Sequence, residues 1–276
     1  MSGDRFNGKT PTLYIEGPAF WAPTLPGWEA ARAVFRGEAQ PADPPAKRPA
    51  PQLLAPAERR RAPDTVALAL EVAGAAIAGS GRQASELPCV FASAYGDLAI
   101  NDYMSATLVT SPTQLSPTKF HNSVHNAAVG YWTIATGCMA SSNSLTAHQA
   151  TFAAGLLEAA VQVAADGQAV LLAGFDVAAV GALAGVAHSE GMLAGAMVIA
   201  PERSARTVAA FDWSLRPGDT HAVALRSPAA QALAGNAMAD ALPLFEALAL
   251  GADATLALPL SARLALQLQL RPQHSG

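Results

Sequence analysis

Residues 141–167 read SSNSLTAHQATFAAGLLEAAVQVAADG, and no other stretch of this chain predicts as much about it. The small polar residues at its start predict a short strand, and the apolar residues after the first third have the spacing of a helix that a glycine ends. The unbroken apolar run at 168–174 then predicts a buried strand. Between the first strand and the helix lies a tight corner, which contains no cysteine and consists of His148, Gln149, Ala150 and Thr151.

The composition is typical of a compact protein of packed helices and sheets. Of the 276 residues, 51% are hydrophobic and only 14% are charged, which excludes a disordered chain. The net charge of -4 is small, and the longest basic run, the triplet at 59–61, is expected to be a solvated surface segment. We therefore expect a single domain over 1–276 and no nucleic-acid partner.

The cysteine content and the N-terminal segment point to a reducing compartment. Cys89 and Cys138 form neither a disulfide framework nor a metal-ligand pattern. Residues 1–9 lack the apolar core of a secretory signal, so a cytoplasmic protein is expected. The apolar stretch at 168–187 has about the length of a membrane span, but Asp176 and three glycines within it favour a buried strand with a Gly/Ala-rich connection.

Strands and helices are expected to alternate along the chain, which indicates an α/β layered sandwich. The segment 37–63 contains seven prolines and is expected to be a loop without regular helix or strand. Pro259 and Pro272 restrict the last strand to a sheet edge. Besides the elements of the opening stretch, the expected strands are 12–16, 87–94, 191–200, 207–214, 222–226 and 255–270, and the expected helices are 28–36, 64–78, 98–109, 120–136 and 229–251.

Three segments, in this order, resemble beta-ketoacyl synthases. The segment SPTKFHNSVHNAA at 116–128 resembles the stretch in which a Ser-Pro turn leads into a helix at the dimer interface. Residues 149–159 resemble the helix that begins at the nucleophile, and ADGQAVLLAGFD at 165–176 resembles the strand element after it. The resemblance covers about residues 60–200. It implies a thiolase-like layered sandwich, mainly the N-terminal half of a ketoacyl synthase, with a shortened and divergent C-terminal portion at 207–276.

The resemblance also implies that the catalytic residues are missing. In the family, a cysteine at the helix N-terminus carries the acyl chain, and the helix dipole and free N–H groups favour its thiolate. The family's spacing places that cysteine at Ala150 of this chain. The two histidines that take part in decarboxylation are absent as well, because no His-Gly-Thr-Gly-Thr motif follows Ala200. We therefore expect no catalytic residue and no cofactor.

Four other side chains are functional candidates. Cys138 is expected to be structural, because it ends the preceding helix, where the dipole raises a thiol pKa. His121 and His125 stand four apart on one expected helix, a spacing compatible with metal binding, but no third ligand is evident and a packing or interface role is expected instead of a metal. His148 has two interpretations, a ligand contact or a polar residue at the helix entry.

The resemblance implies a protein partner. Chain-length factors are ketosynthase-like subunits that lack the cysteine, pair with an active ketosynthase and limit product length by walling off its acyl tunnel. Residues 152–159 resemble the truncated forms associated with aryl polyene and xanthomonadin-type pigment clusters. On this hypothesis the chain forms a heterodimer with an active ketosynthase and meets the acyl carrier protein only indirectly. The expected interface residues are Phe120, His121, Asn122, His125, Asn126 and Leu145.

The alternative is an enzyme with altered chemistry, an acyltransferase or a malonyl decarboxylase. In that case the Gln149 amide would donate to a thioester carbonyl as its oxyanion develops, together with His148 or Thr151. The sequence leaves open the product, the chain length and the residues that line the tunnel. It also leaves open whether the portion from Thr207 onward replaces the missing half or covers an exposed sheet edge.

Overall fold

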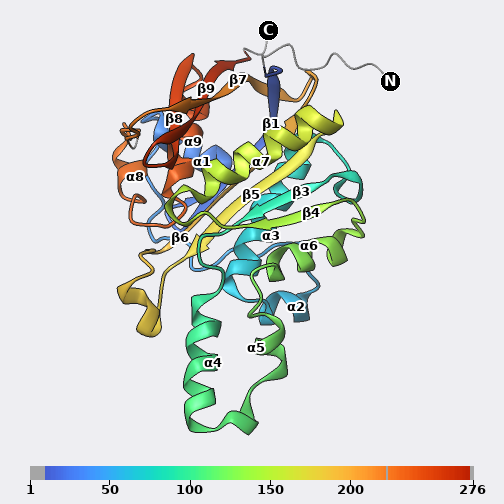
Figure 1. Ribbon diagram of the computed structural model, residues 1–276, viewed down its shortest axis with the longest axis vertical. Coiled ribbons are helices and arrows are strands. Elements are labelled where there is room, and N and C mark those ends of the chain that lie inside the picture. Colours follow the sequence, from blue (N-terminus) through green and yellow to red (C-terminus); the bar gives the residue numbers. More distant parts are fainter. Residues whose placement is uncertain (1–9, 222, 274–276) are drawn as a thin grey trace.

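The computed structural model describes residues 10–221 and 223–273, and in these residues nine strands form one curled, mixed sheet (Figure 1). The three strands at one end, β4, β3 and β5, are parallel, and the other neighbours are antiparallel. The order across the sheet is β4 (Ser142–Leu145), β3 (Cys89–Ala92), β5 (Val170–Val177), β6 (Met192–Ala200), β1 (Leu13–Ala22), β7 (Thr207–Pro217), β9 (Leu264–Pro272) and β8 (Ala254–Ser261), with the short β2 (Leu25–Pro26) paired to β1.

Helices cover both faces of the sheet. On one face α3 packs against β1, β5 and β6, and α6 packs beside α3. On the other face α7 packs against β5 and β3, with α1 and α9 nearby (Figure 1). A pair of helices, α4 and α5, projects from the body as an arm (Figure 1). The helices are α1 (Trp28–Phe35), α2 (Pro56–Arg61), α3 (Asp64–Ser80), α4 (Leu98–Thr110), α5 (Pro117–His121), α6 (Ala127–Thr136), α7 (Thr151–Asp166), α8 (Pro228–Gln231) and α9 (Leu242–Leu250).

The strand expected after the opening stretch is confirmed as β5, and it is buried on both faces. Leu172 belongs to the core under α7, whereas its neighbour Leu171 belongs to the core under α3. A strand between two helical layers needs apolar residues at every position, which explains why the segment resembles a membrane span in composition. Within the described part of the chain, no helix is both long enough and apolar enough to cross a bilayer.

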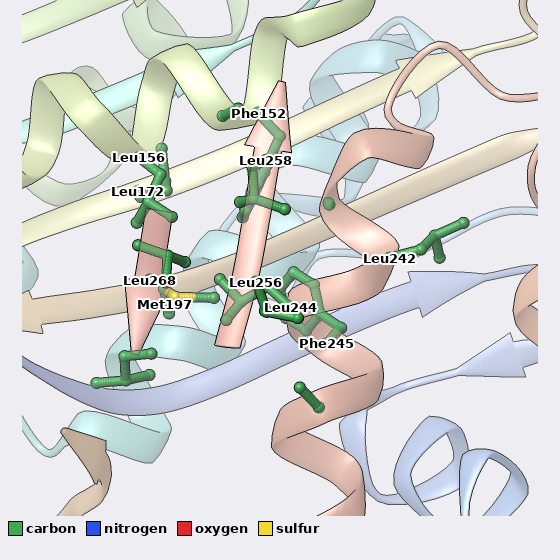
Figure 2. Packing of buried hydrophobic residues seen from close by; sticks show 14 of the residues in the cluster. Phe152, Leu156, Leu172, Met197, Leu242, Leu244, Phe245, Leu256, Leu258 and Leu268 are labelled. Carbon is green, nitrogen blue, oxygen red and sulfur yellow. The ribbon is translucent and has the colours of Figure 1, made fainter. Parts of the chain in front are cut away.

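The C-terminal portion continues the same sheet and curls over α7 and α9. Leu256 and Leu258 of β8 and Leu268 of β9 belong to one buried cluster with Phe152 of α7 and Phe245 of α9 (Figure 2). The portion from Thr207 onward therefore neither hangs free nor merely lines an edge, because its apolar faces complete the core over α7. β8 is an edge strand, as Pro259 predicts.

Two expected elements of the C-terminal portion are wrong in their extent. The single strand expected at 255–270 is a hairpin of β8 and β9, with a tight turn at 262–263 between them. The helix expected at 229–251 is divided into α8, a 3-10 turn (Ala239–Ala241) and α9. The strand expected at 222–226 is wrong for 223–226, which have no regular structure, and Ala222 lies outside the described residues.

Corrections in the N-terminal half have local causes. The strand expected at 12–16 continues through Gly17 to Ala22 as β1, since a bulge absorbs the Gly-Pro pair. A Cβ at Gly17 would lie 2.2 Å from the carbonyl oxygen of Ala76, so α3 approaches β1 closely there. The loop expected at 37–63 contains α2, because Pro56 occupies the first helical turn, where a proline costs no hydrogen bond.

Candidate functional site

The corner between β4 and α7 is braced by one threonine. The Thr151 hydroxyl donates to the carbonyl oxygen of His148 at 2.7 Å and accepts from the N–H of Ala147 at 3.0 Å. These bonds hold His148 at a φ of 53°, a left-handed conformation that side chains other than glycine seldom adopt. Such strain persists only where the surroundings impose it, and it is concentrated at functional sites.

The structure places the four corner residues differently with respect to solvent. His148 and Gln149 are exposed, and the His148 ring meets Tyr95 edge-on at 6.0 Å. Ala150 is half-buried and is the N-cap of α7, so the position predicted for the missing nucleophile does lie at a helix N-terminus. Thr151 is fully buried and its hydroxyl is engaged by both of its bonds, so it is not available as a nucleophile.

Asp240 takes the place at the N-terminus of α7 where an anion is stabilised. Its Oδ2 accepts from the N–H of Ala153 at 3.0 Å, and its Oδ1 is buried with no hydrogen-bond partner in the described structure, although the residue as a whole is half-buried. Burial raises the pKa of the Asp240 carboxyl to about 7, against the lowering effect of the Ala153 and Phe152 N–H groups. The positive end of α7 therefore faces a carboxyl group of the same chain.

Sequence reasoning missed Asp240, which is distant in the chain from the corner. The one signal is its position as a lone charged residue between apolar neighbours in the segment 237–245. A second buried carboxyl, Asp176 at the end of β5, accepts from the Ser93 hydroxyl at 2.9 Å and the Ala94 N–H at 2.8 Å. Burial raises the pKa of Asp176 to about 6.

The corner opens into a cavity of about 640 Å³. One wall is formed by residues 147–150, and the other by the C-terminal portion, including Asp240, Pro243 and Leu258. This volume lies within the range of small-molecule sites. The cavity thus combines an apolar lining with His148, Gln149 and one carboxyl group of raised pKa.

Neither cysteine reaches this cavity. Cys138 is buried, and its Sγ donates to the carbonyl oxygen of Leu87 at 3.4 Å. Cys89 lies inside β3, where burial raises the pKa of its thiol to about 12. Both thiols are buried away from the cavity, and the raised pKa of Cys89 disfavours its nucleophilic thiolate form. The structural role expected for Cys138 agrees with this position.

The expected helix at 120–136 is wrong, and this changes the roles of its histidines. The structure divides the segment into α5 and α6, so His121 ends α5 while His125 lies in the turn and the two share no helix face. Both ring nitrogens of His125 are engaged: Nε2 donates to the carbonyl oxygen of Ser93 at 2.8 Å, and Nδ1 is 2.9 Å from the Ser144 hydroxyl. His125 therefore ties the arm to the ends of β3 and β4. No cluster of three potential metal ligands occurs among the described residues.

The residues expected at a partner interface are not all on the surface. Asn122 is only 4% exposed, so it lies beneath the surface that it was expected to form. His125 and Leu145 are half-buried, and Phe120, His121 and Asn126 are exposed.

An uncovered surface lies along α6 and the neighbouring edge strand β4. Val124 is 52% exposed and Ile134 is 82% exposed, and together with His121 and Asn126 they line a groove of about 340 Å³, which we name the α6 groove. Met139, between α6 and β4, is 94% exposed. β4 is the edge of the sheet, and in the described structure no strand pairs with its outer side.

Comparison with solved structures identifies the architecture. A ketosynthase (ApeO) in complex with its chain length factor (ApeC) from Xenorhabdus doucetiae is similar with a TM-score of 0.72 and 20% identity, covering 94% of this chain and 99% of that chain. A type II polyketide ketosynthase complex with its acyl-carrier protein (AntDE:AntF) has a TM-score of 0.71 at 11% identity, with coverages of 94% and 99%. A beta-ketoacyl synthase from Burkholderia phymatum has a TM-score of 0.60 at 12% identity, covering 78% of this chain and 66% of that one. The thiolase-like layered fold is thereby confirmed.

Sequence comparison supports the same assignment. No curated protein matches this sequence. The family model described as "Beta-ketoacyl synthase, N-terminal domain" matches residues 28–258, which is most of the 276-residue chain and includes the corner, α7 and β5. The chain therefore belongs to the beta-ketoacyl synthase N-terminal domain family.

Proposed function

We propose that this protein is a non-catalytic, ketosynthase-like subunit of the chain-length-factor type, which forms a heterodimer with an active ketosynthase and shapes its acyl tunnel. The pathway is of the aryl polyene type, which the segment 152–159 resembles, and the complex works in the cytoplasm. The observation that carries the proposal is the uncovered apolar surface along α6 and β4, formed by the α6 groove, Met139 and the free edge of β4.

The chemistry of that surface favours a protein partner. Exposed apolar side chains that adjoin one another are typical of a protein interface. The free N–H and C=O groups of an edge strand add directional hydrogen bonds to the burial of those side chains. A ketosynthase fits because this chain belongs to the beta-ketoacyl synthase N-terminal domain family and because the similar complex from Xenorhabdus combines a ketosynthase with its chain length factor.

The end of α7 supports the non-catalytic part of the proposal. A thiolate nucleophile needs a cysteine at this position and a helix dipole free to stabilise it. Ala150 has no reactive group, and the Asp240 carboxyl already accepts from the N–H of Ala153. On this proposal the acyl carrier protein binds the active subunit. This chain then affects the product by shaping the acyl tunnel of that subunit through the shared interface.

Co-purification with a ketosynthase from the same gene neighbourhood tests the proposal. We expect a 1:1 complex in size-exclusion chromatography, and we expect Ile134→Asp or Val124→Asp to dissociate it, because either change places a charge in the interface. Leu215→Asp is the matched control, since Leu215 is 49% exposed on β7 in another part of the fold. A complex that survives both α6-groove variants, or that fails equally with Leu215→Asp, contradicts the proposed surface.

One observation favours a second candidate function, an acyltransferase or malonyl decarboxylase. The 640 Å³ cavity brings His148, Gln149 and Asp240 to one site, and a carboxyl with a pKa of about 7 can act as an acid or a base at neutral pH. The test is turnover of malonyl-carrier protein by the isolated chain. If the isolated chain shows turnover, and His148→Ala, Gln149→Ala and Asp240→Asn each abolish it, the enzyme replaces the subunit proposal. If the isolated chain shows no turnover, the subunit proposal stands.

A further inference from the structure

A second cavity, distinct from the corner, lies at the base of the α4–α5 arm. Its volume is about 770 Å³, and its apolar lining includes Ile100, Val177 and Met192. Three basic side chains line it as well, namely Lys47 of the proline-rich segment, Arg61 at the end of α2 and Lys119 of α5. These residues are far apart in the sequence, and only the fold assembles them.

The charges of this cavity are not balanced. Its two acidic side chains are already engaged: Asp64 forms an ion pair with Arg48 at 2.8 Å, and Asp97 accepts from the N–H of Ile100 at 2.8 Å and from the Thr65 hydroxyl at 3.0 Å. Among the described residues, none of the three basic side chains lining the cavity forms an ion pair with a carboxylate.

Three further features lie in or beside this wall. The Lys119 ammonium is held over the Tyr103 ring, 3.7 Å from its centroid. α3 begins in the same wall, and its cap residue Pro63 satisfies none of its N–H groups with a side chain. Asn122, also in the wall, is 4% exposed, and its Oδ1 has no hydrogen-bond partner in the described structure.

We propose that this cavity binds a small phosphate ester with an apolar body, the phosphate lying among Lys47, Arg61 and Lys119 and the apolar part against Ile100, Val177 and Met192. A phosphate dianion matches several cations better than a single carboxylate does, because its oxygens can accept from more than one of them. The apolar lining excludes a bare inorganic ion as the whole ligand.

One residue of the basic triplet at 59–61 gains a ligand-binding role in this proposal. The sequence alone predicts only a solvated surface segment there. Arg60 and Arg61 are both exposed on the same short helix, but only Arg61 lines the cavity. Arg60→Gln is therefore the matched control for Arg61→Gln. The inference does not depend on the proposed subunit role, since binding here needs neither the α6 groove nor the corner.

Titration calorimetry with monomeric octyl phosphate, inorganic phosphate and uncharged octyl glucoside tests the assignment, on the chain alone or on its ketosynthase complex if it is stable only there. We expect one saturable site, tighter for octyl phosphate than for either control and weakened by salt. Lys47→Gln, Arg61→Gln and Lys119→Gln should each weaken binding about three- to ten-fold, and Arg60→Gln should leave it unchanged.

The outcomes separate the possibilities. Failure of octyl phosphate to bind, equal binding of octyl glucoside, or an equal loss in Arg60→Gln would overturn the proposal. Co-sedimentation with phosphatidic acid vesicles would identify a lipid headgroup as the source of the phosphate. Binding of octyl phosphate without vesicle binding identifies a soluble ester.

Discussion

At the residue scale, Asp240 decides what the corner can do. In an active condensing enzyme the helix N-terminus serves a thiolate, but here the N–H of Ala153 donates to a carboxyl group from a distant segment. The same burial that raises the Asp240 pKa makes its charge costly. The group is therefore a source of pH-dependent stability as well as a cap.

The sign of that dependence follows from the pKa shift. Burial raises the pKa of Asp240 from 3.8 to about 7, so between these values the folded protein binds more protons than the unfolded chain. The stabilising effect of the protonated form is fully present below about pH 4 and is lost as the pH rises to about 7.

Replacement of this carboxyl should remove much of the dependence. We expect Asp240→Asn to increase the free energy of unfolding at pH 8 by about 2 kcal/mol, and at most about 4 kcal/mol, because its side-chain oxygen can still accept from Ala153 without a buried charge. Urea denaturation at pH 5 and pH 8 measures this change in the free energy of unfolding. Asp176→Asn is the comparison, since the pKa of Asp176 is raised to about 6 but its carboxylate has three donors to lose. If Asp240→Asn increased the free energy of unfolding equally at both pH values, the buried charge of Asp240 would not be the cause.

His125 is the residue that attaches the arm to the sheet. We expect His125→Ala to destabilise the fold by about 2 kcal/mol, because the Ser93 carbonyl and the Ser144 hydroxyl lose their shared partner. Amide hydrogen exchange should rise first in α5 and the turn before α6. His121→Ala is the matched control, since His121 is exposed, and its exchange pattern should remain that of the parent.

At the scale of elements, close packing of β6 against α9 depends on a glycine. A Cβ at Gly195 would lie 2.2 Å from Cε2 of Phe245, a ring that is fully buried and cannot move aside. We expect Gly195→Ala to reduce the free energy of unfolding by about 1 to 3 kcal/mol through overpacking. Thermal unfolding measures the change. Gly74→Ala on α3, where a Cβ meets no atom within 4 Å, should be neutral or stabilising.

The elements also explain which expectations from the sequence succeeded. α7 and β5 are long, with consistent patterns, and both were predicted within a few residues. The single helix expected at 120–136 overlooks a local signal, because the residues of 122–126 are all weak helix formers. In the structure His125, which lies in this break, bonds to Ser93 and Ser144 at β3 and β4. The β8–β9 turn was missed because the same alternation of leucines continues in both strands.

At the scale of the molecule, the curl of the sheet joins the C-terminal portion to the α7 core. We expect Leu268→Asp to unfold the whole chain, at a cost above about 4 kcal/mol, because Leu268 is 1% exposed in the core that includes Phe152 and Phe245. Gln269→Asp, one residue further along β9 on the exposed side, should change little.

For Leu268→Asp we expect the circular dichroism signal and the native tryptophan fluorescence to be lost together. This result tests whether residues 1–276 form the single domain that the sequence predicts. Retention of a folded N-terminal half, with only the residues after Thr207 loosened, would mean that the chain has two independent units.

The sequence alone determined the order of elements, the layered α/β class and the absence of a cysteine at the corner, because these depend on local periodicity and residue identity. Only the tertiary structure decided that Asp240 caps α7, that Asn122 is buried, and that Lys47, Arg61 and Lys119 share one cavity. These groups are distant along the chain, and their distances depend on how the sheet curls. That curl is set by the packing of side chains from several elements at once, which no local pattern encodes.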